Sequence, residues 1–406
     1  MFGNVLDDLL SQVWFELTFL LVISLFASFL FARFGQPRVL GYIVVGVVIG
    51  PSALGIIRPE ITHISTQLGS VQLLAELGAI VLLFMIGLEC DLKEIYSRRS
   101  ISIALGGVIV PWVGGYLLAS AMGFGSDAIF IGATLVATSV AVTAGVTSQL
   151  GLIGTPVAYA IVGAAVVDDV LGMIVLGISK GLLPQYGLDV FGILLLILGA
   201  ILFIVLGAWL GARYLTKLVF NVQVRGFRTK LPMSGFILVL AIAFLYSFIA
   251  EAIGVTALVG AFVAGTAFSG SALRDGFRKG TQYLEALFVP LFFVSLGVVV
   301  DVSGFTLADL WFGIVLTIVA LATKIVGCTI PARMTGMSWW DSFAVGVGMT
   351  PRLEIALVIA YYGLTNGIIA EKVYSIVVFM GLLTAIFAPS MLGRVLKRGG
   401  HAILGG

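Results

Sequence analysis

Long apolar runs, separated by short joints that are polar or rich in glycine and proline, fill almost the whole chain. A bilayer core of about 30 Å requires roughly 20 apolar residues per helix, and the joints divide the sequence into about thirteen runs of that order. The runs lie at about 12–33, 39–57, 71–89, 101–122, 127–150, 156–180, 190–216, 233–253, 255–270, 282–300, 305–330, 338–362 and 373–394. This pattern predicts an all-α membrane protein of about thirteen transmembrane helices, without a soluble domain.

Composition also excludes a soluble fold. Of the 406 residues, 60% are hydrophobic and 10% are charged, which leaves too little polar surface to cover a soluble domain. The net charge of +2 gives no reason to expect nucleic acid as a partner. Cys90 and Cys328 lie far apart, in or beside apolar runs, so we expect packing residues and neither a disulfide nor a metal site. The first run lacks a basic leader and a cleavage site, so it is predicted to stay as a helix.

Lysine and arginine fall mostly on one side of the predicted membrane. Seventeen of the 22 lie in joints that share one side, namely Arg33, Arg38, Lys93, Arg98, Arg99, Arg213, Lys217, Arg225, Arg228, Lys230, Arg274, Arg278, Lys279, Arg333, Arg394, Lys397 and Arg398. Arg58, Lys180 and Lys372 lie on the other side, and Lys324 and Arg352 fall inside runs. Because cytoplasmic loops carry the basic excess, the amino terminus is predicted outside and the carboxyl terminus in the cytoplasm.

Two pairs of runs, seven runs apart, resemble each other. The stretch LGYIVVGVVIGPS is weakly similar to LVGAFVAGTAFSG. The run that follows each stretch begins near a glutamate and later contains a glycine and then an aspartate. The matched residues are Gly41, Gly46 and Gly50 with Gly260, Gly265 and Gly270, then Glu76, Gly87 and Asp91 with Glu285, Gly297 and Asp301. An odd separation makes the copies antiparallel, as in the inverted repeats of secondary transporters. Repeat one is predicted at about 12–180, a linker helix at 190–216 and repeat two at 233–394.

The runs 127–150 and 338–362 occupy corresponding places in the two repeats. The first carries Thr138 and Ser139 in mid-membrane, where their hydroxyls can satisfy freed backbone groups. The second carries Pro351 after several glycines, and proline removes a backbone donor. Each run alone would also fit a simple kink. As a matched pair they predict two discontinuous helices whose broken ends face an ion site.

Ionisable side chains inside a membrane span are costly and are functional candidates by default. Asp168 and Asp169 lie near the centre of the run GAAVVDDVLGMIVLG, and Lys324 is alone in IVLTIVALATKIVG. Adjacent helical residues point about 100° apart, so the two carboxylates should have different partners. We predict that Lys324 pairs with one of them, and a purely structural salt bridge is the alternative reading of that pair.

Two further charge pairs have less defined roles. Arg352 and Glu354 follow the proline of the second broken run, where they are predicted to neutralise helix-end dipoles and hold the break in shape. Glu76 and Glu285 lie near the starts of corresponding runs, and their role stays open.

These residues resemble the membrane domain of the cation:proton antiporter superfamily, and most closely its sodium/proton branch of the NapA kind. The matching stretches extend over essentially the whole chain; they are GYIVVGVVIGPSALG, AELGAIVLLFMIGLE, GATLVATSVAVT, GAAVVDDVLGMIVL, FVPLFFVSLGV, ATKIVG and MTPRLEIALVIA. The resemblance implies a mobile core, with two crossing discontinuous helices beside the aspartates, which moves elevator-fashion against a dimerisation scaffold. The core would comprise the fourth to sixth and the eleventh to thirteenth runs.

The same resemblance assigns site residues. Asp169 would be the essential carrier of the sodium ion and the proton, and Asp168 would pair with Lys324. Thr138 and Ser139 would lie in the unwound stretch that supplies cation-ligating oxygens. No cofactor is implied besides the transported Na⁺ and H⁺, with Li⁺ as a further cation, and the expected assembly is a homodimer in the inner membrane.

We therefore expect residues 1–398 to form a single transmembrane antiporter domain, followed by a short cytoplasmic tail at 399–406. The predicted function is electrogenic exchange of H⁺ for Na⁺, and the protein is not expected to be an enzyme. Potassium/proton antiporters of the Kef kind are the alternative, although their usual glutamine before a single aspartate is absent here. A channel would need rings of pore-lining carbonyls or charges. An aspartyl protease would need two carboxyls that share a proton, which neighbouring helical residues do not readily do.

Overall fold

The computed structural model describes residues 13–57, 70–89, 97–182, 189–298, 300, 302 and 304–398, and within these residues every regular element is helical. The helices of the first half are α2 (Val13–Arg33), α3 (Arg38–Ile49), α4 (Ser70–Glu89), α6 (Arg98–Ala121), α7 (Ala128–Thr134), α8 (Val140–Gln149) and α9 (Pro156–Gly181). Those of the second half are α10 (Val190–Leu210), α11 (Thr216–Arg228), α12 (Ser234–Ile253), α13 (Ala257–Phe268), α14 (Arg274–Val298), α15 (Leu307–Met334), α16 (Trp339–Gly348), α17 (Glu354–Thr365) and α18 (Glu371–Arg398).

In the described part of the chain, 8 helical segments are long and apolar enough to cross a membrane. Shorter apolar helices accompany them at Arg38–Ile49, Ala257–Phe268 and Ile355–Leu364. The protein is therefore an all-helical membrane protein. The count of about thirteen spans stays a prediction, because it also requires short and broken helices to cross the bilayer core of about 30 Å.

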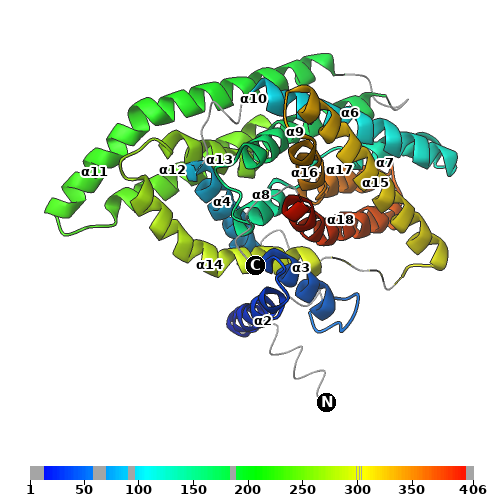
Figure 1. Cartoon of the computed structure of the whole chain (residues 1–406), viewed down its shortest axis with the longest axis horizontal. Helices are drawn as coiled ribbons and strands as arrows, with labels where there is room; N and C mark the ends of the chain where they lie inside the picture. Colours follow the sequence, from blue (N-terminus) through cyan, green and yellow to red (C-terminus); the bar gives the residue numbers. More distant parts are fainter. Residues whose placement is uncertain are drawn as a thin grey trace.

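Helix packing divides the molecule into two groups (Figure 1). In the first group, α2, α3, α4 and α10 to α14 pack on one another, chiefly through α4 against α13 and α14 and through α3 against α14. In the second group, α6 to α9 and α15 to α18 pack on one another, chiefly through α6 against α15 and α9. The second group coincides with the runs that the family resemblance assigns to a mobile core.

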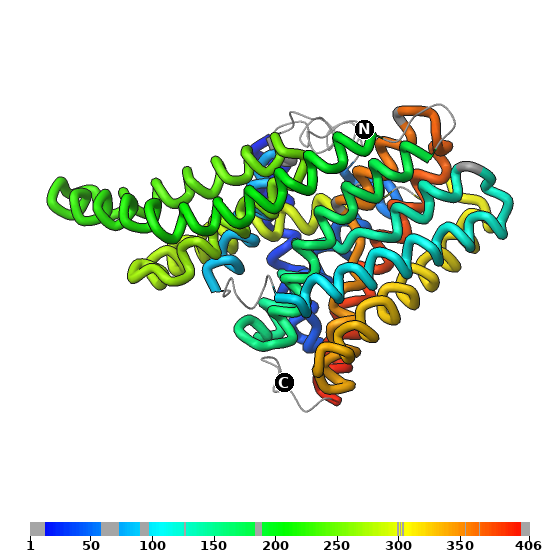
Figure 2. The backbone as a smooth tube through the Cα atoms, turned by 90° about the horizontal axis from the view of Figure 1, so that it is seen from above, coloured from blue at the N-terminus to red at the C-terminus, as the bar shows by residue number. Residues whose placement is uncertain are grey.

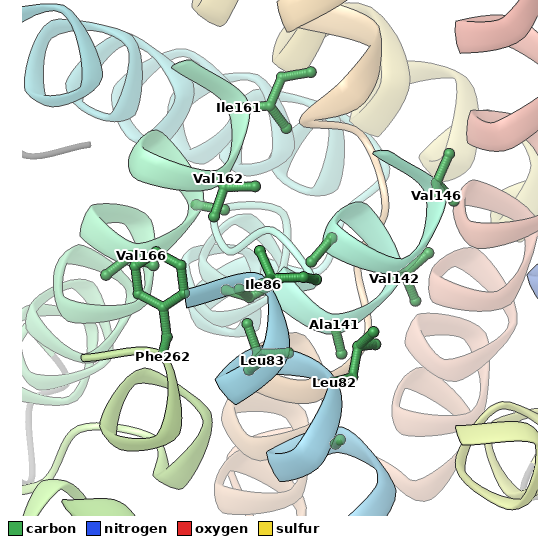
Figure 3. Packing of buried hydrophobic residues seen from close by; sticks show 14 of the residues in the cluster. Leu82, Leu83, Ile86, Ala141, Val142, Val146, Ile161, Val162, Val166 and Phe262 are labelled. Atoms are coloured by element: carbon green, nitrogen blue, oxygen red, sulfur yellow. The ribbon is translucent and has the colours of Figure 1, made fainter. Parts of the chain in front are cut away.

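The boundary between the two groups is largely apolar. Side chains of α4, α8 and α9 meet there, and Phe262 of α13 lies beside Val166 of α9 (Figure 3). These residues belong to one continuous buried hydrophobic cluster that extends through both groups. Contacts of this kind are non-directional, so the apolar packing by itself does not fix one register of the two groups.

Glycine pairs allow close helix crossings in the first group. A Cβ atom at Gly46 of α3 would lie 2.2 Å from the carbonyl oxygen of Val294 in α14, and one at Gly87 of α4 would lie 2.4 Å from that of Phe262 in α13. Gly46 faces Gly297, and Gly87 faces Gly265. The sequence comparison pairs Gly46 with Gly265 and Gly87 with Gly297, so each of these glycines contacts a glycine in the other half of the chain. The inverted repeat itself stays a prediction.

One helix differs from its predicted length. Instead of ending at about residue 216, the linker helix continues through a π-helical turn at Gly211–Leu215 into α11, giving one segment over Val190–Arg228 (39 residues). It extends past the rest of the molecule in Figure 2. Its last part is amphipathic and carries Lys217, Arg225 and Arg228. Because this part is not continuously apolar, the apolar run in the sequence ends before the helix does.

Candidate functional site

Helix α9 carries both aspartates into the interior. It begins with Thr155, whose hydroxyl accepts a hydrogen bond from the backbone N–H of Ala158, and with Pro156 at its first position. Asp168 is 0% exposed and Asp169 is 2% exposed. Burying a carboxylate is costly unless it is paired or hydrogen-bonded, so the contacts of each define what it can do.

Asp168 lies in contact with Lys324, its predicted partner. The Lys324 ammonium donates to Oδ2 of Asp168 at 2.7 Å, to the carbonyl oxygen of Gly107 at 2.7 Å and to that of Val136 at 2.6 Å. An ammonium has three N–H donors, so all of them are used. Oδ2 of Asp168 also accepts the backbone N–H of Thr138 at 2.9 Å. These bonds connect Lys324 of α15 to α6, to α9 and to the segment before α8.

The first discontinuous helix is interrupted at 135–139, between α7 and α8. Two carbonyl groups of this segment point at buried cations, since Val136 accepts from Lys324 and Ala137 accepts from Nη1 of Arg352 at 3.3 Å. The break therefore exposes carbonyl oxygens that no helical N–H satisfies, and two positive side chains replace those donors.

The second discontinuous helix is interrupted at 349–353, between α16 and α17, and it crosses the first. The backbone N–H of Ser139 donates to the carbonyl oxygen of Pro351 at 2.7 Å. The hydroxyl of Thr138 donates to the carbonyl oxygen of Met349 at 3.0 Å. The two non-helical segments thus satisfy each other's backbone groups at the centre of the second helix group.

Arg352 is fully buried at this crossing. Its Nη2 donates to the carbonyl oxygen of Ala320 in α15 at 3.1 Å, and its backbone N–H donates to the hydroxyl of Thr384 in α18 at 3.1 Å. These bonds join the break to two neighbouring helices, which fits a role in holding its shape. Glu354 begins α17, but its side chain lies outside the described part of the structure.

Asp169 faces the first helix group. Its Oδ2 accepts a hydrogen bond of 2.6 Å from the hydroxyl of Thr256, the residue that immediately precedes α13. The carboxylate therefore lies at the amino-terminal, positive end of that helix, which stabilises negative charge. Sequence reasoning did not identify Thr256, because a threonine before a helix is an ordinary cap and its sequence distance from Asp169 hides the contact.

The remaining predicted residues have structural surroundings. The hydroxyl of Ser139 accepts the backbone N–H of Val142 and caps α8. Cys328 is a buried free thiol. Glu285 is half-buried in α14, and the nearby Glu89 forms an ion pair with Arg278 at 2.8 Å. Several residues of the sequence argument lie outside the described residues, namely Arg58, Cys90, Asp91, Lys93 and Asp301.

Comparisons with known proteins identify the family of the chain and support its fold. The family described as the transmembrane sodium/hydrogen exchanger matches residues 20–398. The chain is 36% identical to the Na⁺/H⁺-K⁺ antiporter GerN of Bacillus cereus over 388 residues, covering 94% of this chain and 95% of GerN. It is 32% identical to a Na⁺/H⁺ antiporter of Enterococcus hirae, covering 94% and 97% of the two chains. The structure of the sodium proton antiporter MjNhaP1 from Methanocaldococcus jannaschii superposes with a TM-score of 0.64 at 17% identity, covering 94% of this chain and 97% of that one.

Proposed function

The chain belongs to the sodium/hydrogen exchanger family, and from this membership we propose that it exchanges H⁺ for Na⁺ with Asp169 as the shared carrier. Cation/proton exchange itself follows from the family, whose members are transporters and not enzymes. One observation carries the assignment of Asp169: it is a buried carboxylate in mid-helix that faces the opposite helix group, whereas Asp168 is fixed to Lys324.

Competition for one carboxylate would couple the two ions. A buried carboxylate is costly to move through an apolar boundary unless a proton or a cation neutralises it. A sodium ion prefers oxygen ligands, which Asp169, the hydroxyls of Thr138 and Ser139, and carbonyl groups of the breaks would supply. Either ion would therefore permit movement, and an empty carboxylate would oppose it.

The two helix groups are the proposed moving parts. The second group would be a core that shifts elevator-fashion against the first group, which would be a scaffold and the contact surface of a homodimer. The apolar boundary between the groups supports sliding, because few directional bonds must break. A fully active monomer in native lipid would contradict the dimer.

The proposal also covers the extent of the transport domain and the sides of the membrane on which its two termini lie. Residues 1–398 would form one transport domain of about thirteen spans in the inner membrane. The amino terminus would lie outside and the carboxyl terminus inside. A reporter fused after Arg398 should then be cytoplasmic and one placed before Val13 external, and finding both on one side would refute the odd span count.

Potassium is the second candidate cation, because the similar protein GerN is a Na⁺/H⁺-K⁺ antiporter. The sequence lacks the usual features of Kef-type potassium antiporters in this region, which favours sodium. Proteoliposomes loaded with one cation at a time would rank Na⁺, Li⁺ and K⁺ directly.

Proton flux in those proteoliposomes also tests the carrier. Asp169→Asn should abolish sodium-dependent proton flux, since an amide neither releases a proton nor neutralises a cation. Asp189→Asn is a matched control, because this exposed aspartate caps α10 through a hydrogen bond from Gly192 that asparagine can also accept. Substantial exchange by Asp169→Asn would defeat the proposed site.

A further inference from the structure

A cavity of about 410 Å³ lies apart from the aspartates, where the end of α2 and the start of α3 meet the end of α8 and the last turns of α18. Arg38 comes from the start of α3, and Arg394 and Lys397 come from the end of α18. The described residues that line the cavity include no aspartate or glutamate. The cavity wall therefore carries three positive side chains, of which Arg38 also interacts electrostatically with Glu285 outside the lining.

Neutral hydrogen-bond donors lie beside these positive side chains. The side-chain oxygen of Gln149 accepts the backbone N–H of Val39 at 3.1 Å, and the side-chain oxygen of Gln36 accepts the hydroxyl of Ser390 at 2.9 Å. With both oxygens engaged, each amide keeps its NH₂ group as a donor. Helix α3 also begins at this wall, so its amino-terminal dipole adds partial positive charge.

From this arrangement we propose that the cavity binds the phosphate group of an anionic phospholipid. Three cations, two amide donors and a helix amino terminus together match a phosphate oxygen cluster. The choice of a lipid comes from the neighbouring surface, because Phe34, which directly follows α2, is 70% exposed next to the cavity, and Phe29 near the end of α2 is also 70% exposed. Acyl chains would lie on these exposed side chains while the headgroup fills the cavity.

The cavity bridges the two helix groups. Its walls come from α2 and α3 on one side and from α8 and α18 on the other, and the bonds from Val39 to Gln149 and from Ser390 to Gln36 cross the same boundary. A bound phosphate would add ionic contacts to both groups and hold them in this relative position. That consequence rests on the proposed movement of the groups, whereas binding itself does not.

Thermal unfolding of the detergent-purified protein tests the binding step. Phosphatidylglycerol should raise the unfolding midpoint of the wild type more than phosphatidylcholine does, because a ligand that binds only the folded state stabilises it. Arg394→Gln combined with Lys397→Gln should abolish that difference. Arg225→Gln combined with Arg228→Gln removes the same charge from the exposed end of α11 and should preserve it.

A second comparison distinguishes free inorganic phosphate from a phospholipid headgroup. Protection of the wild type and the α11 control by inorganic phosphate alone, lost in the cavity variant, would keep the anion site and overturn the lipid. Equal protection of all three proteins by phosphatidylglycerol would overturn the site. If the double variant is unstable, Lys397→Gln with lipid retention in native mass spectrometry gives the same comparison. None of these measurements requires transport, so they stand whether or not Asp169 proves to be the carrier.

Discussion

The hydroxyl of Thr256 and the carboxylate of Asp169 are joined by a hydrogen bond of 2.6 Å that crosses from one helix group to the other. Thr256 immediately precedes α13, which packs on α4 and α12, and Asp169 lies on α9, which packs on α6. If the groups move, this bond must break in each cycle. Thr256 would then act on exchange by positioning Asp169.

Replacing Thr256 with valine removes the hydroxyl and keeps the shape of the side chain. A hydrogen bond to a charged group contributes about 1.5–3 kcal/mol, and 1.4 kcal/mol is a factor of ten in an equilibrium. Without the bond Asp169 loses the contact that holds it in position. We expect the apparent KM for Na⁺ to rise by about tenfold.

Thr256→Ser is the control, because serine keeps the donor and should retain the wild-type KM. The measurement is sodium-dependent proton flux in proteoliposomes over a series of Na⁺ concentrations. An unchanged KM in the valine variant would show that the bond has no part in ion binding.

The pair of Asp168 and Lys324 should contribute strongly to stability. Asp168→Asn leaves the ammonium of Lys324 buried without its counter-charge, and breaking a buried pair in this way costs about 3–5 kcal/mol. The double variant Asp168→Asn, Lys324→Gln removes both charges and should recover part of the loss. Thermal unfolding of the purified single and double variants measures the coupling. Equal unfolding midpoints of the wild type and Asp168→Asn would contradict the assignment.

The glycine crossing of α3 and α14 should not tolerate a methyl group. A Cβ at Gly46 would lie 2.2 Å from a backbone oxygen of α14, so Gly46→Ala must push the helices apart. Overpacking of this kind costs about 1–3 kcal/mol. Gly276→Ala in α14 is the matched control, because a Cβ there meets no heavy atom within 4 Å. The unfolding midpoint should fall only in the first variant, and a similar midpoint for both would argue against a rigid crossing.

Local sequence signals anticipated part of the site. Asp168, Asp169 and Lys324 are conspicuous because charges are rare in apolar runs, and one salt bridge follows from pairing them. The two breaks follow from polar residues and a proline inside otherwise helical runs. The matched glycines follow from spacing, and the structure places four of them, Gly46, Gly87, Gly265 and Gly297, at helix crossings.

Other features could not be predicted, since they depend on how distant segments meet. Nothing local links Thr256 to Asp169, or Arg38 to Lys397 in one cavity. Lys324 and Arg352 are bound by backbone carbonyl groups, which every residue has, so the residue types do not indicate these contacts. The extension of the linker helix to Arg228 is encoded in amphipathic periodicity, which a search for apolar runs ignores.

The exchange is expected to move net charge across the membrane. If Asp168, Asp169 and Lys324 all change protonation or partner during the cycle, two protons can exchange for one sodium ion, and one positive charge then crosses with each turnover. Each elementary charge is worth about 2.3 kcal/mol per 100 mV of membrane potential. An interior-negative potential should therefore accelerate proton entry and sodium export. Exchange by Asp169 alone would be one for one and would not respond to voltage.

Proteoliposomes with the potential set by potassium and valinomycin provide the measurement. The same potassium gradient without valinomycin is the control, because it reveals any transport of potassium itself. A rate of sodium-dependent proton flux that rises with the imposed potential supports involvement of the Asp168 and Lys324 pair. A rate indifferent to the potential would point to one-for-one exchange at Asp169. The pair that Lys324 makes with Asp168 and with two backbone carbonyls would then be a fixed structural element.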